Sequence, residues 1–75
     1  MKEIKVLSSN GHDIGATWGT DAKSRAAAQK TFDQLVAKGF TLFAAPADGG
    51  TATSKLDRFD PEADTIIAVP QLRGG

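Results

Sequence analysis

Cysteine is absent from this chain of 75 residues, which excludes disulfide bonds and thiolate zinc sites as sources of stability. A chain this short buries only about 60% of the surface that it exposes when unfolded. One small core therefore has to stabilise the fold, and a content of 40% hydrophobic residues is sufficient to build it. The absence of cysteine also fits a reducing compartment, and we expect a cytoplasmic protein.

A net charge of either sign is absent too, because nine acidic residues balance nine basic ones. A balanced surface does not attract phosphate groups over a distance, so we do not expect nucleic acid as a partner. Long apolar runs are missing as well: the longest have about five residues, whereas a membrane helix needs roughly 20. The alternating pattern begins directly after Met1, so we expect neither a signal peptide nor a membrane partner.

The first 18 residues have the alternation of a β-hairpin with one buried face. Apolar side chains occur at every second position: Ile4 and Val6 in the first half, and Ile14, Ala16 and Trp18 in the second. Asn10-Gly11 lies between them, and this dipeptide tolerates the positive φ angles that a tight turn requires. We therefore expect antiparallel strands at residues 2–8 and 12–18, with these apolar side chains on the buried face.

The segment from Ala22 to Lys38 contains neither Gly nor Pro and predicts a helix. Its apolar residues recur at spacings of three and four, which places them on one stripe: Ala28, Phe32, Leu35 and Val36. Thr20 or Asp21 is suited to the N-cap, and Gly39 to the left-handed position after the last turn.

Two β-prone runs follow, at residues 40–45 before Pro46 and at residues 65–69 before Pro70. The second run has successive hydrophobic residues, which is typical of a central strand that is covered on both faces. A central position places this strand beside the first one, and we expect the two to be parallel.

The segment between these runs has no single periodicity. Residues 47–51 predict a turn or loop, and residues 60–63 predict a turn. Within the ambiguous range 52–63, Leu56 and Phe59 are candidate anchors for a compact turn. The order hairpin, helix, strand, irregular crossover and strand predicts an α+β fold, the β-grasp, in which one helix packs across a mixed sheet.

The end of the chain resembles the end of ubiquitin. The resemblance is carried by Leu56-Asp57-Arg58-Phe59-Asp60-Pro61, by the run from Asp64 to Pro70, and by Leu72-Arg73-Gly74-Gly75 at the same spacing. Element order and length are also similar to ubiquitin across the chain, while residue similarity outside the tail is faint. We therefore expect a divergent ubiquitin-like protein, with a prokaryotic source as one option, consisting of a domain at 1–70 and a flexible tail at 71–75.

The resemblance implies a protein modifier that is not itself an enzyme. An ATP-dependent activating enzyme would adenylate the carboxylate of Gly75, and a conjugating enzyme would carry it as a thioester. The carboxylate would then form an isopeptide bond with a lysine of a target protein, and a protease would reverse the modification. The nucleophiles belong to the partners, so we expect a monomer without a cofactor, a metal or a catalytic residue of its own.

The residue types of the tail suit this chemistry. Gly74 and Gly75 lack Cβ atoms, so the backbone can enter a narrow channel and bring its last carbonyl to a nucleophile. Arg73 can make charge-assisted hydrogen bonds to acidic groups of an activating enzyme, and Leu72 can serve as an apolar anchor. Gln71 departs from ubiquitin, which has an arginine that activating enzymes recognise there, and this difference favours a dedicated activating enzyme.

The last predicted strand also contains a candidate docking patch. Ile67 and Val69 point away from the helix if Ile66 and Ala68 point towards it, although a shift of one residue reverses the two faces. Receptors of ubiquitin-like folds dock on the exposed face of the sheet, so Ile67 and Val69 are candidate partner-binding residues.

Two other groups of residues have a simpler interpretation. His12 is the only histidine, and without a second ligand nearby it indicates a solvated loop residue rather than a metal site. Four carboxylates gather around Pro61, namely Asp57, Asp60, Glu62 and Asp64, and their position in a turn favours a surface or capping role over catalysis.

Two alternative functions stay open at this point. In sulfur carriers with a β-grasp fold, the terminal carboxylate becomes a thiocarboxylate that donates sulfur to cofactor synthesis. Leu72-Arg73 favours the modifier, because the carriers usually have small or proline-rich residues there. The second alternative is a binding module whose sheet face acts and whose tail is incidental.

Overall fold

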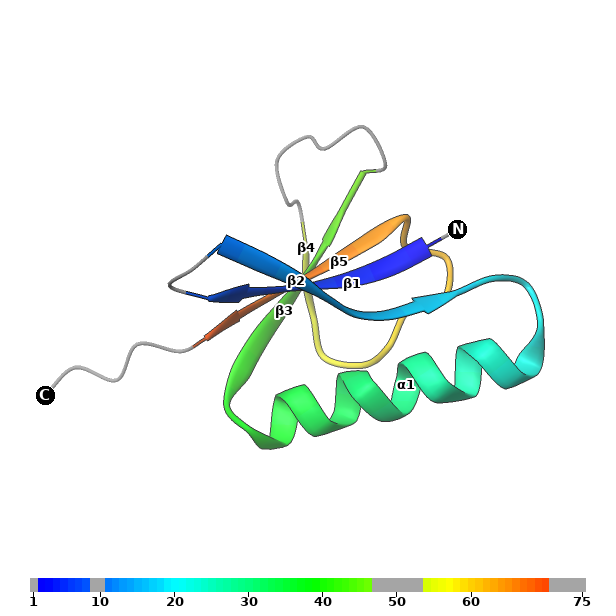
Figure 1. The fold of residues 1–75 in the computed structure, drawn as a ribbon, viewed down its shortest axis with the longest axis horizontal. Helices are drawn as coiled ribbons and strands as arrows, with labels where there is room; N and C mark the ends of the chain where they lie inside the picture. Colours follow the sequence, from blue (N-terminus) through cyan, green and yellow to red (C-terminus); the bar gives the residue numbers. More distant parts are fainter. Residues whose placement is uncertain (1, 9–10, 47–53, 71–75) are drawn as a thin grey trace, which may run out of the picture.

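The computed structural model describes residues 2–8, 11–46 and 54–70. In these residues, one helix lies across one face of a five-stranded sheet (Figure 1). The elements in chain order are β1 (Lys2–Ser8), β2 (Gly11–Trp18), α1 (Ala22–Ala37), β3 (Phe40–Ala45), β4 (Ser54–Leu56) and β5 (Thr65–Pro70).

The strand order is β2-β1-β5-β3-β4, so the last strand lies in the middle of the sheet. β5 runs parallel to β1, where Ile66 is opposite Ile4, and antiparallel to β3, where Ile66 is opposite Ala44. The prediction of a central last strand, parallel to the first, is confirmed. The result is the expected α+β architecture with a β-grasp-like arrangement.

Helix α1 begins at the predicted Ala22 and ends at Ala37, one residue before the predicted end, and both of its ends are capped. The side chain of Asp21 accepts a hydrogen bond from the backbone N–H of Ser24 at 2.8 Å and another from the Ser24 hydroxyl at 2.7 Å. These two bonds to Ser24, the hydroxyl first, lower the pKa of Asp21, because they favour its ionised form. At the other end, Gly39 has the predicted left-handed conformation, with φ +92°.

The buried stripe of α1 is shorter than predicted. Ala28, Phe32 and Leu35 are buried as expected, but Val36 is 47% exposed. Val36 is in the last turn of a helix that ends at Ala37, where it lines an open groove rather than the core. The prediction is therefore wrong for this position.

Trp18 is at the centre of the core and is fully buried. Its ring makes an edge-to-face contact with Phe59 at 5.0 Å between centroids, and Phe59 is 6.1 Å from Phe32 in a similar geometry. The indole Nε1 donates a hydrogen bond to the carbonyl oxygen of Pro61 at 3.1 Å. Phe59 therefore anchors the crossover between β4 and β5, as predicted.

The predicted hairpin is confirmed, but one of its side chains is on the other face. The register shifts between Ile4 and Lys5, so that Ile4 is opposite Ala16 and Lys5 is opposite Ile14. Gly15 is the extra residue of this β-bulge, and a Cβ there would be 2.9 Å from Cγ2 of Val6. Ile14 consequently lies on the face away from the helix and is 51% exposed, which corrects the prediction that it is buried.

The predicted turn at residues 60–63 is confirmed by a hydrogen bond from the N–H of Ala63 to the carbonyl of Asp60 at 3.2 Å. The short strand β4 was not predicted, because three residues are too few to show a periodicity. Leu56 at its end packs against the core, as expected for an anchor. The loop predicted at residues 47–51 lies outside the described residues.

Candidate functional site

The five predicted conjugation residues, Gln71, Leu72, Arg73, Gly74 and Gly75, lie outside the described residues. The strand that leads to them is described to its end. β5 has neighbours on both sides, β1 and β3, and its last residue Pro70 is opposite Phe40 at the start of β3. The point from which the tail begins is therefore fixed in the middle of the sheet.

The two faces of β5 are clearly distinguished by burial. Ile66 and Ala68 are fully buried against the helix side, whereas Ile67 and Val69 are only partly buried. The structure thus supports the predicted face assignment for Ile67 and Val69 rather than the reversed one. Successive side chains of a strand alternate between the two faces, so Ile67 and Val69 lie on the opposite face from Ile66 and Ala68. Helix α1 covers only one face of the sheet (Figure 1), and we call the other one the open face.

One row of register partners crosses all five strands on the open face. In strand order it consists of Ile14, Lys5, Ile67, Phe43 and Lys55. Side chains of paired residues lie next to one another on the same face of a sheet. The row therefore has an apolar centre, Ile67 and Phe43, with a lysine on each side.

The charged group of Lys5 in this row takes part in only a weak ion pair. The Nζ of Lys5 is 3.7 Å from Oε1 of Glu3, and both side chains are about one third exposed. A pair this exposed contributes at most about 1 kcal/mol, so Lys5 can exchange Glu3 for an acidic group of a partner. Val69, opposite Thr41, continues the apolar surface towards the end of β5. This arrangement is suited to binding another protein.

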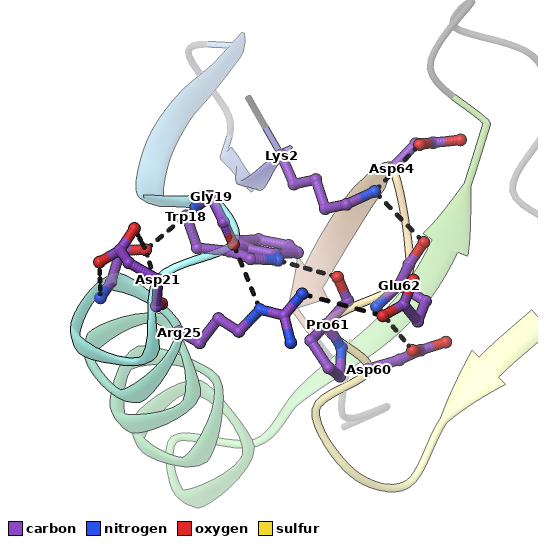
Figure 2. Close-up of polar contacts among 10 residues, drawn as sticks. Lys2, Trp18, Gly19, Asp21, Arg25, Asp60, Pro61, Glu62 and Asp64 are labelled. Carbon is purple, nitrogen blue, oxygen red and sulfur yellow. Dashed lines mark hydrogen bonds and ion pairs between the residues drawn. The ribbon is translucent and has the colours of Figure 1, made fainter.

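The carboxylates around Pro61 have structural contacts instead of forming a catalytic pair (Figure 2). Asp60 Oδ1 accepts a hydrogen bond from the N–H of Glu62 at 2.9 Å, which stabilises the turn before β5. Asp64 Oδ1 accepts one from Nζ of Lys2 at 3.2 Å, and the same Nζ is 3.4 Å from the carbonyl oxygen of Glu62.

Arg25 connects this turn to the start of the helix (Figure 2). Its Nε donates a hydrogen bond to the carbonyl oxygen of Gly19 at 3.2 Å, and its Nη2 is 3.8 Å from Oε1 of Glu62. Together with the contacts of Trp18 and Lys2, these bonds fasten the crossover to β1, β2 and α1. The surface role that the sequence favours for these carboxylates is consistent with this geometry.

Comparisons with protein-family models, with curated proteins and with solved structures find no match.

Sequence reasoning identified only Ile67 of the row on the open face and missed the other four members, Ile14, Lys5, Phe43 and Lys55. Phe43 could have been found from the alternation of residues 40–45, once Phe40 and Leu42 are assigned to the helix side. The outward position of Ile14 could not be predicted, because it depends on a bulge for which Gly15 is the only signal in the sequence. Lys5 could not be placed beside Ile67 without the parallel pairing of β1 and β5.

In the part of the chain that the structure describes, no group of three or more His, Cys, Asp or Glu side chains is placed to hold a metal ion. The side chain of His12 is outside that part. Within residues 2–8, 11–46 and 54–70, no helix has the length and apolar character needed to cross a membrane.

Proposed function

We propose that this chain is a ubiquitin-like protein modifier, which becomes joined through the carboxylate of Gly75 to lysine side chains of target proteins. The observation that carries the proposal is the segment Leu72-Arg73-Gly74-Gly75, which is separated by Gln71 alone from the central strand of a β-grasp-like sheet. A rigid domain and a tail with two unhindered glycines are the two parts that such a modifier requires.

The chemistry proceeds in three substitutions, the first at the α-phosphorus of ATP and the next two at the carbonyl carbon of Gly75. The Gly75 carboxylate first attacks the α-phosphorus of ATP on an activating enzyme, which forms an acyl-adenylate and releases pyrophosphate. A cysteine thiolate of a partner then displaces AMP to give a thioester. A lysine amine of the target finally displaces the thiolate and leaves an isopeptide bond, which a deconjugating protease can hydrolyse.

In this proposal the chain contributes recognition and the reacting carboxylate, and its partners contribute every nucleophile. Arg73 and Leu72 bind the conjugating enzymes, and Gln71 distinguishes this modifier from relatives with an arginine there. Ile67 and Val69 on the open face, beside Phe43, form the surface for receptors of the conjugated protein. The balanced net charge and the absence of cysteine are compatible with a monomer in the cytoplasm.

The proposal is tested by expressing the chain with an N-terminal tag in its native host, beside variants that lack Gly74-Gly75 or carry Gly75→Ala. Denaturing gels with a reductant should show tagged bands of higher mass for the unaltered tail. These bands should disappear with the deletion and become much weaker with the alanine, whose methyl group crowds the tetrahedral intermediate.

Intact mass spectrometry separates the alternatives. If the intact mass of the chain shows one terminal oxygen replaced by sulfur, and no adducts are found, the protein is a sulfur carrier. Neither adducts nor sulfur in the native host would contradict both activation chemistries and favour a binding module that acts through the open face.

A further inference from the structure

A second recessed surface lies on the helix side of the sheet, between the end of α1, the start of β3 and the edge strand β4. Four apolar side chains line it, Val36 from the helix, Phe40 and Leu42 from β3, and Leu56 from β4, together with Gly39 and Thr41. Lys55 and Asp57, at the edge of the sheet, complete the lining, and both are exposed. We call this recess the β4 groove.

The β4 groove leaves apolar surface in contact with water. Leu42 is buried at its floor with 1% exposure, but Val36 is 47% exposed. The packing of the chain explains why: the last turn of α1 approaches β3, whereas no contact of comparable extent joins α1 to β4 among the described residues. An apolar side chain from another molecule would remove this surface from water, which is favourable in proportion to the area covered.

Size and charge restrict what the β4 groove can accept. Its volume is about 260 Å³, slightly below the range of about 300 to 1,000 Å³ for pockets that hold drug-sized molecules and cofactors. Its lining has one positive and one negative side chain, so it offers no net attraction to a polyanion. A recess of this size can hold one apolar side chain of a protein, against Val36, Phe40 and Leu56.

The groove lies at the end of the domain from which the tail begins. Phe40, one of its walls, is the register partner of Pro70, the residue from which the tail begins. The five residues from Gln71 to Gly75 span at most about 18 Å when fully extended. An enzyme that encloses the carboxylate of Gly75 must therefore lie against this end of the domain.

We infer that the β4 groove receives an apolar side chain of the enzyme that activates Gly75, as a second point of attachment beside the tail. The inference rests on the proposed function and adds to it a site on the domain itself. Two points of attachment would let that enzyme distinguish this domain from any other chain that ends in two glycines. Truncating a central apolar contact of this kind typically weakens association by tenfold or more.

The test uses two single substitutions on the same helix that change charge equally. Val36→Asp places a carboxylate in the groove, and Gln29→Asp places one on the exposed outer face of α1. Val36→Ser is the second groove variant, which removes the apolar surface without adding charge. Thermal unfolding of the purified variants first establishes that each one folds.

Each tagged variant is then expressed in the native host, and two products are measured: adducts that a reductant removes, which are thioesters, and adducts that resist it. We expect both groove variants to lower both products at least roughly tenfold, because the lost contact acts at activation. Gln29→Asp should leave both products at the level of the unaltered chain.

Each other outcome has a definite meaning. Groove variants that fold and form thioesters at the normal level would overturn the inference and leave the proposed function intact. Equal losses in Gln29→Asp would also overturn it, since the effect would then belong to the whole helix. Absence of adducts even from the unaltered chain would overturn the proposed function, and the inference with it.

Discussion

The indole Nε1 of Trp18 donates a hydrogen bond to the carbonyl oxygen of Pro61, 43 residues later in the chain, at 3.1 Å. The bond joins the end of β2 to the turn that precedes β5. Because β5 leads directly to the tail, this contact fixes the strand on which the proposed function depends.

Replacing Trp18 by Phe should destabilise the fold by about 1 to 3 kcal/mol. The substitution keeps an aromatic ring next to Phe59 but removes the donor, so the partly buried carbonyl of Pro61 loses its partner. Urea unfolding followed by circular dichroism measures the change, since Trp18 is the only tryptophan and its fluorescence is lost in the variant. A change within error of zero would show that the hydrogen bond is dispensable.

Gly15→Ala tests the β-bulge. An added Cβ would be 2.9 Å from Cγ2 of Val6, so the strand or the side chain must move, and we expect a loss of about 1 to 3 kcal/mol. Gly19→Ala is the matched control, because its Cβ would meet Asp21 Oδ1 at an ordinary 3.5 Å. Chemical denaturation should show that Gly15→Ala is clearly less stable than Gly19→Ala. Equal stabilities of the two variants would contradict the bulge geometry.

The two isoleucines on either side of the sheet provide a second test of the register. Ile4→Ala should cost about 2 to 5 kcal/mol because the side chain is fully buried. Ile14→Ala should cost about 1 kcal/mol or less, since half of its surface already contacts water. If Ile14 proved as important for stability as Ile4, the buried face predicted from simple alternation would be correct after all.

This pair also shows which parts of the structure could be predicted from the sequence. Strict alternation, the N-cap Asp21 and the left-handed Gly39 are local signals, and they predicted the two hairpin strands and the helix. The face of Ile14 depends on a bulge, and the neighbours of Lys5 depend on strand pairing between distant segments. The exposure of Val36 depends on where the helix ends relative to β4, which no local pattern encodes.

The stability of the domain should depend on pH through Asp21. Its pKa is lowered in the folded state by the hydrogen bonds from Ser24, so ionised Asp21 stabilises the fold above its ordinary value near 3.8. This contribution should disappear as the pH falls below that value and through the lower folded pKa. Asn also caps helices but does not titrate, so Asp21→Asn is the appropriate comparison.

Urea unfolding of both proteins between pH 2 and 6 measures this effect. The stability difference between the unaltered chain and Asp21→Asn should be constant at the upper end of the range. Below pH 4 the unaltered chain should lose stability relative to the variant. A difference that does not change with pH would exclude Asp21 as the titrating group.

The measurement that tests the modifier proposal most directly is the mass of the remnant that a protease leaves on target lysines. Tagged chain from the native host is purified under denaturing conditions and divided between two digests, beside a copy that lacks Gly74-Gly75. Trypsin cleaves after Arg73 and should leave Gly-Gly on the modified lysines. For a protease specific for lysine, the last cleavage site in the chain is after Lys55, so this digest should leave the segment from Leu56 to Gly75 on the same lysines.

The proposal predicts both remnants at matching sites, and it predicts that neither remnant is found with the copy that lacks Gly74-Gly75. Lysines without the longer remnant, or remnants that persist with the deletion, would contradict it.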